Sequence, residues 1–391
     1  MMLKTFLPAG LGALLALTAV GAELSQMAVY RSGDGYHTFR IPALITSAKG
    51  TLLAFAEARD VNSRMDSGNI DMVLKRSTDG GKTWGPLQVV FDFGEDTIGN
   101  PTPVVDRKSG TIILVLTRNP GHLTLPDFVR ERGGGTRTVW VTRSTDDGRT
   151  WSKPQEITNS AKLPDMTAYW TGPGNGIQLR SGRLVIPSYH VRRLPPEARS
   201  ALDGPDDNSK IGNIVERLLA PYFFSHMLYS DDGGRSWKLG GNAQPKTGEC
   251  AAAELADGSL LLNMRNYYGR GLKATARSRD GGLTWTGAGF DEALTEPVCQ
   301  ASLIRYGKKG DRLLFSNPAA MKRVNMTVRL SEDGGRSWVA QRVLHEGPSA
   351  YSSLAELRDG AIACLYERGD KGPYETITFA RFSLDWLKQR P

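Results

Sequence analysis

One octapeptide occurs five times along this chain, and it constrains the fold more than any other feature of the sequence. Each copy follows the pattern S-x-D-x-G-x-[ST]-W. Ser and Asp fix tight turns by bonding nearby backbone groups, Gly takes conformations with positive φ, and the Trp ring can be buried between strands. The copies span Ser77–Trp84, Ser144–Trp151, Ser230–Trp237, Ser278–Trp285 and Ser331–Trp338. Such recurrence is typical of repeat folds, so the sequence predicts an array of similar units.

Strand-like segments flank the copies. DMVLKRS, TVWVTRS, LKATARS and NMTVRLS precede four of them, and polar or Pro-broken return segments follow. Between copies, Ser-Gly or Asp-Gly turns lead into apolar strands such as SGTIILVL and DGSLLLNM. Two hairpins per period make a four-stranded antiparallel sheet, and radial repetition of such sheets makes a β-propeller. The sequence therefore predicts an all-β propeller, with one short helix in a polar excursion at about 195–219. Five copies leave the blade count open, since one blade can lack a copy.

The composition excludes several classes of protein. With 40% hydrophobic and 23% charged residues, the 391-residue chain is neither disordered, nor a collagen, nor a polytopic membrane protein. The net charge is +8, but Lys and Arg are scattered without a basic run, which argues against a nucleic-acid partner. The three cysteines, Cys250, Cys299 and Cys364, lack metal-binding spacing and allow at most one disulfide.

The N-terminus has the pattern of a secretory signal peptide. Lys4 precedes an uncharged apolar run from Phe6 to Val20, and Gly21-Ala22 provides a small-residue cleavage site. The run of 15 residues is too short to span a bilayer, which needs about 20. We therefore expect residues 1–22 to be removed, no stable membrane anchor, and a secreted or periplasmic protein. Residues 23–391 would form a single propeller domain.

Phe39-Arg40-Ile41-Pro42 lies shortly before the first octapeptide. This FRIP motif, followed by five octapeptides of the kind called Asp boxes, resembles the sialidase (neuraminidase) family of glycoside hydrolases, in its bacterial secreted exo-α-sialidase type. The resemblance runs from about Tyr30 to Glu367, nearly the whole chain after the signal peptide. It implies a six-bladed β-propeller with the active site at one end of the central axis.

The resemblance also implies that three arginines bind the carboxylate of the substrate. They are Arg40 in the FRIP motif, Arg265 in DGSLLLNMRN and Arg329 in NMTVRLSEDGG. Arginine suits this task because its planar guanidinium binds a carboxylate in a bidentate manner and stays charged. Two like charges 4 Å apart repel by about 4 kcal/mol at an effective dielectric constant of about 20, so the cluster needs an anion or acidic neighbours. Glu367 matches the family glutamate that steadies the first arginine.

Tyr351, in GPSAYSSL, matches the family nucleophile, and Glu249, in KTGECAAAEL, matches the glutamate that activates it. Sialic acid carries a carboxylate on its anomeric carbon, which would repel a carboxylate nucleophile. A neutral phenol avoids that repulsion, and a nearby Glu can take its proton. Glu254 competes with Glu249, which we prefer because it precedes the strand, whereas Glu254 abuts the Asp-Gly turn.

The general acid/base is expected between the FRIP motif and the first octapeptide, where Asp60, Asp66 and Asp71 compete. Asp66 fits the family pattern best because it lies just before a small-residue turn that leads into the next strand. Arg59 matches a family arginine near O4 of the sugar.

Two further segments resemble walls of the family's site. Asn100-Pro101 stands where many bacterial relatives have Asp-Pro, so a direct role for Asn100 is doubtful. The segment YWTGPGNGIQL, with Trp170 and Gly174, resembles a loop on the aglycone side, although its glycines could equally serve turns.

These matches predict a hydrolase that removes terminal α-linked sialic acids from glycoproteins such as mucins, from glycolipids such as gangliosides, or from oligosaccharides. Asp66, Glu249 and Tyr351 would act with retention of configuration. The octapeptides lack the D-x-D-x-D ladder of calcium loops, so neither a metal nor a cofactor is expected. The alternatives are a trans-sialidase and a non-catalytic sialic-acid-binding propeller. A protein-binding propeller would need none of these residues.

Overall fold

The computed structural model describes residues 24–60, 66–200, 202, 218–307 and 310–389. The predicted signal peptide, residues 1–22, lies outside these residues. Within the described ranges, no helix has both the length and the apolar character needed to cross a membrane.

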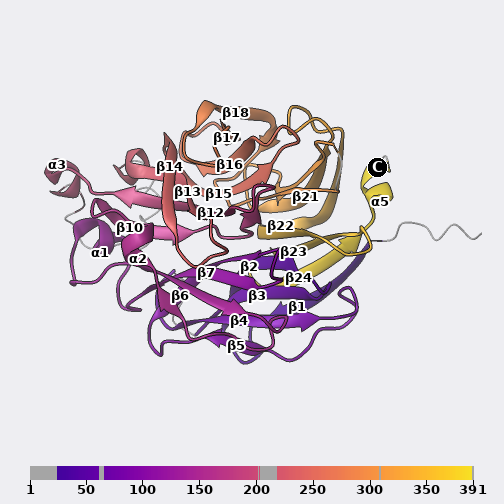
Figure 1. Cartoon of the computed structure of the whole chain (residues 1–391), viewed down its shortest axis with the longest axis horizontal. Helices are drawn as coiled ribbons and strands as arrows, with labels where there is room; N and C mark the ends of the chain where they lie inside the picture. Colours follow the sequence, from indigo (N-terminus) through magenta and orange to yellow (C-terminus); the bar gives the residue numbers. More distant parts are fainter. Residues whose placement is uncertain (1–23, 61–65, 201, 203–217, 308–309, 390–391) are drawn as a thin grey trace, which may run out of the picture.

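The described residues form mainly antiparallel β-strands, which confirms the predicted all-β propeller of four-stranded sheets (Figure 1). Followed along the chain, the pairings of the described strands form six successive sets of four, which we call blades, with β10 and β11 taken as one interrupted strand and β22 shared by two sets. The first two blades contain β2 (Thr38–Thr46), β3 (Leu52–Arg59), β4 (Ile70–Ser77) and β5 (Gln88–Phe91), then β6 (Thr97–Val105), β7 (Ile112–Asn119), β8 (Thr138–Ser144) and β9 (Gln155–Glu156).

The third blade begins with an interrupted inner strand, and the fourth is regular. They contain β10 (Met166–Thr171) with β11 (Ile177–Gln178), β12 (Leu184–Arg192), β13 (Phe223–Ser230) and β14 (Lys238–Pro245), then β15 (Thr247–Glu254), β16 (Leu260–Asn266), β17 (Leu272–Ser278) and β18 (Thr286–Thr295).

The last two blades share one long strand, and the N-terminal strand completes the sixth. They contain β19 (Ser302–Arg305), β20 (Leu313–Pro318), β21 (Val324–Ser331) and β22 (Ala340–Glu356), then β22 again with β23 (Ile362–Arg368), β24 (Thr376–Phe382) and β1 (Ser25–Arg31). Figure 1 shows the indigo N-terminal strand beside the yellow C-terminal ones. This last blade has no octapeptide, which explains why five copies occur.

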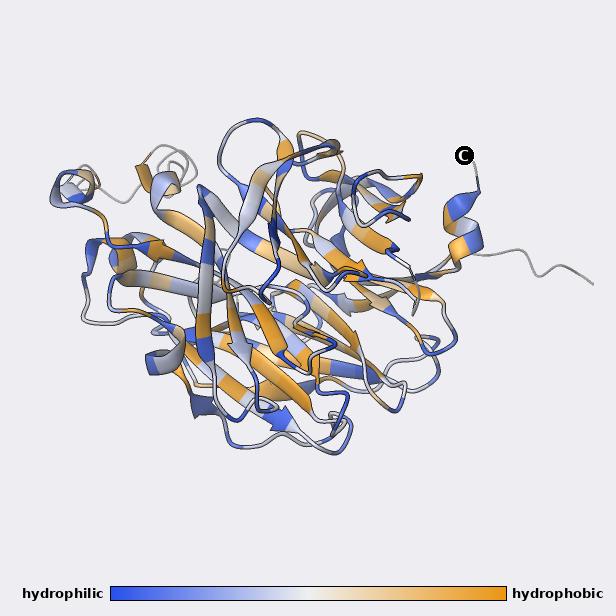
Figure 2. Ribbon diagram, turned by 45° about the horizontal axis from the view of Figure 1, so that its top comes forward, coloured by the Kyte–Doolittle hydropathy of each residue, from blue (hydrophilic) through white to orange (hydrophobic). Residues whose placement is uncertain are grey.

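The innermost strands converge on one axis. A cavity of about 340 Å³ lies there, and each blade contributes lining residues from its inner strand. These include Leu44, Val104, Ile177, Ala253, Ile304 and Leu354. Figure 2 shows hydrophobic residues concentrated along the strands and hydrophilic residues in the connecting loops.

Each octapeptide forms the turn between the third and fourth strands of a blade, as the sequence predicts. In all five copies the Ser hydroxyl donates to the Asp carboxylate at 2.7–2.8 Å and accepts the N–H of the Gly in fifth position at 2.8–2.9 Å. The Ser or Thr before the Trp donates its hydroxyl to the same carboxylate at 2.6 Å. The polar groups of each turn are thus hydrogen-bonded to one another within the same octapeptide.

The octapeptides also join neighbouring blades. One arginine of the preceding blade donates to a backbone carbonyl of each copy, and the acceptors are in order Gly80, Asp147, Gly234, Gly281 and Gly334. The donors are Arg381, Arg76, Arg143, Arg183 and Arg277. The Trp rings of two copies also pack against the preceding blade: Trp151 contacts Phe55 of the first blade, and Trp84 contacts Phe379 of the sixth.

The register places the octapeptides at one end of the propeller. In the first blade, Thr46, Leu52 and Ser77 are aligned, and Ser77 begins an octapeptide. Arg59 and Ile70 are aligned at the opposite end. We call the octapeptide side, with Ser77 and its equivalents, the repeat end.

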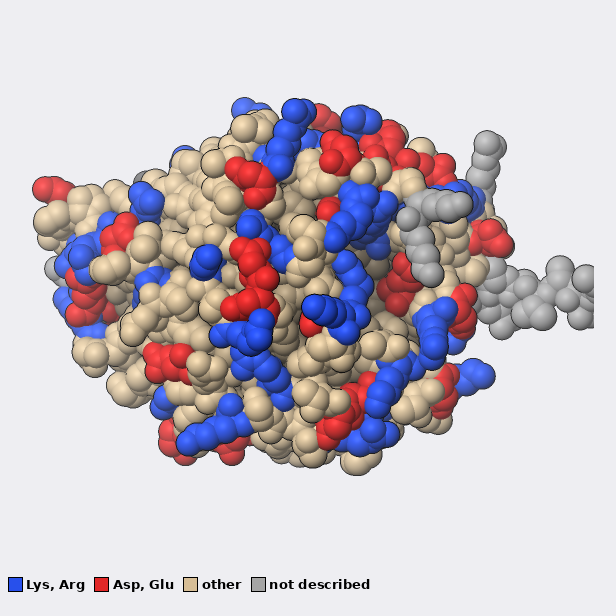
Figure 3. Space-filling view, in the orientation of Figure 1, with Lys and Arg blue, Asp and Glu red and all other residues tan. Residues whose placement is uncertain are grey.

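Short helices interrupt the strands. They are α1 (Leu125–Arg130), α2 (Thr158–Ala161), α3 (Pro196–Ser200), η3 (Ala220–Tyr222) and α5 (Leu384–Lys388). The helix α3 lies in the region 195–219, where the sequence predicts a short helix; residues 201 and 203–217 of that region lie outside the described residues. The others span six residues or fewer, too short for a hydrophobic period to reveal them. On the face in Figure 3, Lys and Arg lie interspersed with Asp and Glu.

Candidate active site

Tyr351 lies at the centre of a polar cluster at the end opposite the octapeptides, which we call the site end. Its hydroxyl donates to Glu249 on β15, and the other oxygen of Glu249 accepts from Arg265 on β16 at 2.9 Å. The same nitrogen of Arg265 also lies 3.3 Å from the Tyr351 hydroxyl. Tyr351 and Glu249 are each 6% exposed. The structure thus brings together three of the predicted residues.

Glu367 on β23 holds the first arginine beneath this pair. One of its oxygens accepts from Arg40 Nε at 2.7 Å and from the backbone N–H of Ile41 at 2.8 Å, and the other accepts from the backbone N–H of Tyr351 at 3.0 Å. Both backbone N–H groups are freed by irregularities in the strand register, and Ile41 has a φ of 56°. A buried carboxylate thus fixes the kinks that aim Arg40 and Tyr351 at the same point.

The prediction that Arg329 is the third arginine of the cluster is wrong. Arg329, the residue expected there, donates to Asn317 Oδ1 at 2.9 Å and to Gln341 Oε1 at 3.1 Å, away from Tyr351. Arg323 lies beside Tyr351, where the third arginine is expected. Its guanidinium lies 5.6 Å from the centre of the Tyr351 ring, and its Nη1 donates to the hydroxyl of Tyr374 at 2.9 Å.

The reason is the direction of β21. This strand runs from the site end to the repeat end, where Ser331 starts an octapeptide. Arg323 precedes the strand, whereas Arg329 lies six residues further along, which is about 20 Å at 3.3 Å per residue. An arginine two residues before an octapeptide belongs to the repeat end. That spacing is the signal in the sequence that identifies Arg323.

The cluster carries an excess of positive charge. Arg40 and Arg265 pair with Glu367 and Glu249, but no carboxylate of the described residues lies within ion-pair distance of Arg323. Burial and the negative charge of Glu249 raise the pKa of Tyr351 well above its usual value, although Arg265 and Arg323 oppose this. Tyr351 is therefore a neutral phenol at rest, and Glu249 is the group placed to take its proton.

Asp66 lies near Arg59 and Arg40, whose charges act on it. Its carboxylate accepts from Arg59 Nη2 at 2.9 Å, and three quarters (75%) of its side chain is exposed. Partial desolvation would raise the pKa of Asp66, but Arg59 and Arg40 outweigh that effect and hold the pKa below its usual range. Of the competitors, Asp71 accepts from Tyr36 at 2.6 Å and Asp60 is an exposed residue after β3. The carboxylate of Asp66 thus joins the arginine cluster.

Glu57 supports this side of the site, and the sequence analysis missed it. It bonds Arg59 through one oxygen and accepts the backbone N–H of Asn100 at 2.8 Å through the other. Asn100 has a φ of 59°, and its own side chain donates to the carbonyl of Thr171 at 3.0 Å. Asn100 is thus a structural residue. A Glu inside the apolar segment LLAFAEAR was the available signal, because buried carboxylates need partners.

Arg137 connects Asp66 to two stacked aromatic side chains. Trp170 and Tyr189 stack with centroids 4.9 Å apart, and the Arg137 guanidinium lies 4.8 Å from the Trp170 ring. Arg137 donates to the backbone carbonyl of Asp66 at 3.3 Å. Gly174, the other residue of this loop singled out in the sequence, donates its backbone N–H to Pro101 and so serves the turn.

The alternatives for the second glutamate and for a metal can also be examined. Glu254 accepts the backbone N–H of Arg180 at 3.0 Å, away from Tyr351. Among the described residues, no three His, Cys, Asp or Glu side chains are grouped so that they could hold a metal ion. The three cysteines are buried and unpaired.

A family model described as a BNR repeat-like domain matches residues 50–364. A sialidase of Bacteroides fragilis is 35% identical over 357 residues, which cover 85% of this chain and 60% of the relative. A sialidase of Micromonospora viridifaciens is 32% identical, covering 90% of this chain and 53% of the relative. The chain thus spans little more than half of these two proteins. An exo-alpha-sialidase of Aspergillus fumigatus is 34% identical, covering 92% of this chain and 87% of the relative.

Solved structures agree with these relatives. A Hadza microbial sialidase has a TM-score of 0.79 and 30% identity, covering 93% of this chain and 69% of that chain. The intramolecular trans-sialidase from Ruminococcus gnavus has a TM-score of 0.73 over 96% of this chain and 100% of that chain, but only 20% identity, so it shows the shared fold alone.

Proposed function

The chain belongs to the sialidase family, and on that premise we propose that it is an exo-α-sialidase. Its substrates would be terminal α-linked sialic acids on glycoproteins, mucins, gangliosides or oligosaccharides. The observation that carries the proposal is the Tyr351–Glu249 hydrogen bond enclosed by Arg40, Arg265 and Arg323. A protein that only binds a glycan needs the arginines but not this acid–base pair.

The arginines would bind the carboxylate of the sugar. Three guanidinium groups face two carboxylates, so a monoanionic ligand neutralises the cluster. Bidentate bonds to planar guanidinium groups also orient that ligand. The carboxylate is attached to the anomeric carbon, which would therefore lie next to the Tyr351 hydroxyl.

Tyr351 would attack the anomeric carbon. As its oxygen bonds to that carbon, its proton passes to Glu249, and the bond to the aglycone oxygen breaks. Asp66 gives the leaving oxygen a proton. In the second half, Asp66 takes a proton from water, the water oxygen bonds to the anomeric carbon, and Tyr351 leaves and regains its proton from Glu249. Two displacements at one carbon retain its configuration.

Substrate binding would prepare Asp66 for its role. In the free protein Arg59 and Arg40 hold the pKa of Asp66 low, which suits a base but not an acid. The carboxylate of a bound sialic acid cancels part of that positive charge. It therefore raises the pKa of Asp66 and favours the protonated acid that the first step requires.

We also propose that residues 1–22 are cleaved and that the protein is exported. Support comes from the charged start, the apolar run and the small-residue site in the sequence. Intact mass of the protein recovered from the periplasm or medium of a bacterial host would test this. A mass that includes residues 1–22 would contradict it.

The activity is tested with a fluorogenic α-sialoside and the purified protein. We expect hydrolysis, and NMR should detect the α-anomer of sialic acid before mutarotation, as retention requires. Product analysis separates hydrolysis from transfer to another acceptor. A folded protein that binds a dehydrated sialic acid analogue but releases no sugar would instead be a lectin. A folded protein that shows no binding and no hydrolysis at millimolar ligand concentration would refute a sialic-acid site.

A further inference from the structure

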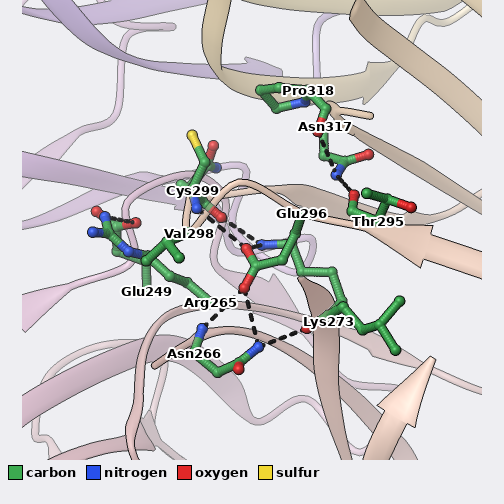
Figure 4. Close-up of polar contacts among 12 residues, drawn as sticks. Glu249, Arg265, Asn266, Lys273, Thr295, Glu296, Val298, Cys299, Asn317 and Pro318 are labelled. Atoms are coloured by element: carbon green, nitrogen blue, oxygen red, sulfur yellow. Dashed lines mark hydrogen bonds and ion pairs between the residues drawn. The ribbon is translucent and has the colours of Figure 1, made fainter. Parts of the chain in front are cut away.

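A second ion pair lies buried beneath the site, and nothing in the proposed mechanism uses it. Lys273 on β17 is fully buried, and Glu296, directly after β18, is 2% exposed. Lys273 Nζ lies 3.0 Å from Glu296 Oε2. Figure 4 shows the two side chains meeting between Asn266 and Cys299.

Stability alone is a poor reason for such a pair. Removing two charges from water costs several kcal/mol per ion, and an apolar pair of similar volume is often as stable or more stable. The relevant question is which neighbouring groups this pair fixes.

The pair clamps both backbone polar groups of Cys299. Lys273 Nζ donates to the Cys299 carbonyl at 2.5 Å, and Glu296 Oε2 accepts the Cys299 N–H at 3.2 Å. The other oxygen of Glu296 accepts the backbone N–H of Asn266 at 3.2 Å and its side-chain amide at 3.0 Å (Figure 4). Asn266 directly follows Arg265.

The clamped segment touches the remaining parts of the site. Val298, with a φ of 54°, accepts Arg323 Nη2 on its carbonyl at 3.3 Å. The Cys299 side chain packs in one cluster with Tyr351. Gln300 exchanges two hydrogen bonds with the backbone of Ser352, at 3.0 and 2.9 Å. Segment 296–300 thus contacts Arg323 and Tyr351 directly, and it contacts Asn266, the residue after Arg265.

The same device occurs twice more at this end. Glu367 and Glu57 accept the backbone N–H groups of Ile41 and Asn100, which themselves have a positive φ, whereas Glu296 accepts the N–H of Cys299, the residue after Val298. Each of the three carboxylates is paired with a cation. For Glu367 and Glu57 the cation, Arg40 or Arg59, also reaches the candidate site. In the third pair the cation is Lys273, which is fully buried. It can therefore act on the site only through Cys299, whose carbonyl it binds.

From this arrangement we propose that Lys273 and Glu296 form a positioning unit for the reaction. They fix Val298 and Cys299 so that Arg323, Arg265 and Tyr351 face one substrate carboxylate and one anomeric carbon. Neither residue touches substrate. The inference rests on the proposed sialidase activity.

The test is the double variant Lys273→Met/Glu296→Gln, which removes both charges and nearly conserves volume. Its matched control is Arg76→Met/Asp147→Asn, which removes the partly buried pair at the repeat end. Both are compared with the wild type by thermal unfolding, by kcat and KM on a fluorogenic α-sialoside, and by calorimetric affinity for a dehydrated sialic acid analogue.

We expect kcat/KM of the Lys273/Glu296 variant to fall about 10- to 100-fold at a temperature where it is fully folded, which is the scale found for residues that orient the ligands of metal sites. Affinity for the analogue should fall with it, because Arg323 loses its backbone anchor. The control should keep kcat/KM within about twofold, since its pair is far from Tyr351. A folded Lys273/Glu296 variant with wild-type kcat/KM would overturn the proposal, as would an equal loss in the control.

A second arm separates this proposal from the proposed function. Crystal structures of the wild type and of the isosteric single variant Glu296→Gln report the position of Arg323 whatever the substrate is. We expect the Val298–Cys299 peptide and the Arg323 guanidinium to shift. An unmoved Arg323 would overturn the positioning role even if the wild type hydrolyses sialosides, whereas an inactive wild type with a shifted Arg323 in the variant would overturn only the activity.

Discussion

Arginines are prominent at both ends of this propeller, but their partners differ. At the repeat end, Arg277 and its four equivalents donate to backbone carbonyls of the neighbouring octapeptide. At the site end, Arg40 and Arg265 share buried carboxylates around Tyr351, and Arg323 has a phenol and a carbonyl as partners. At the repeat end the arginines are used as hydrogen-bond donors to the neighbouring blade. At the site end, three arginines converge on Tyr351 with two paired carboxylates, which leaves positive charge available for a ligand.

The repeat end therefore contributes mainly to stability, and the site end mainly to activity. Interactions that are complete in the free protein stabilise it, and interactions left incomplete can bind something else. Substitutions at the two ends should therefore separate cleanly: those at the repeat end change the free energy of unfolding, and those at the site end change turnover.

The largest effect is expected from Tyr351→Phe. This change removes only the hydroxyl that bonds Glu249, so the fold should persist while kcat falls about 1000-fold or more, as when one member of a catalytic set is lost. Steady-state kinetics on a fluorogenic α-sialoside measures it. Tyr366→Phe, which removes a hydroxyl bonded to Gln26, is the matched control and should keep wild-type kcat. Equal activity in both variants would remove Tyr351 from the mechanism.

At the repeat end, Asp232→Ala should act on stability instead. Its carboxylate accepts three hydrogen bonds, from the Ser230 hydroxyl and from the N–H and hydroxyl of Ser236. We expect a loss of about 2 kcal/mol in the free energy of unfolding, at roughly 1 kcal/mol per net hydrogen bond with partial compensation by water. Denaturant unfolding measures the loss. A kcat/KM more than about threefold below wild type at 20–25 °C would contradict the division between the two ends.

The repeat end should also set the acid limit of the fold. Burial opposes the effect, but hydrogen bonds from Thr284 and Ser337 lower the pKa values of Asp280 and Asp333 to about 2. A pKa that is depressed in the folded state contributes stability that is complete above the unfolded value of about 3.9 and is lost as pH falls through the folded value. The melting temperature should therefore drop between about pH 4 and pH 2. In the double variant Asp280→Asn/Asp333→Asn this drop should be shallower, and an unchanged slope would refute the assignment.

The smallest effect is expected from Arg277→Met. Its guanidinium donates to the carbonyl of Gly334 in the next blade at 3.1 Å, and the apolar stem is retained in methionine. The free energy of unfolding should fall by about 1 kcal/mol, the usual net value of one hydrogen bond. Activity should be unchanged. A loss of substrate affinity in this variant would mean that charge at the repeat end influences the site.

The same contrast explains what could be predicted from the sequence. The turn at Ser230–Trp237 is defined by bonds within eight residues, so the pattern of one copy is enough to predict it. The Asp-Gly hairpins and the strands around them are equally local. The propeller class follows from repeating these units, and the missing octapeptide of the last blade follows from its closure by β1.

The site is not local, because it joins β2, β15, β16, β22 and β23. The resemblance to a family supplied Asp66, Glu249 and Tyr351, which the structure brings to one end. It failed where two arginines, Arg323 and Arg329, lie on one segment, and only the strand direction distinguishes them. Supporting residues such as Glu57, Tyr374 and Lys273 carry no motif, since their role depends on contacts between blades.

Arg323 and Arg329 offer the most direct test of the account, because they bracket one strand and belong to opposite ends. The measurement is the calorimetric affinity of Arg323→Met and Arg329→Met for a dehydrated sialic acid analogue, with melting temperatures recorded in parallel. We predict that Arg323→Met weakens binding about 100-fold or more, as expected when a charged hydrogen-bonding partner of a carboxylate is lost. Arg329→Met should bind like the wild type. Loss of binding in Arg329→Met together with wild-type affinity in Arg323→Met would contradict the assignment of the anion-binding cluster to the site end.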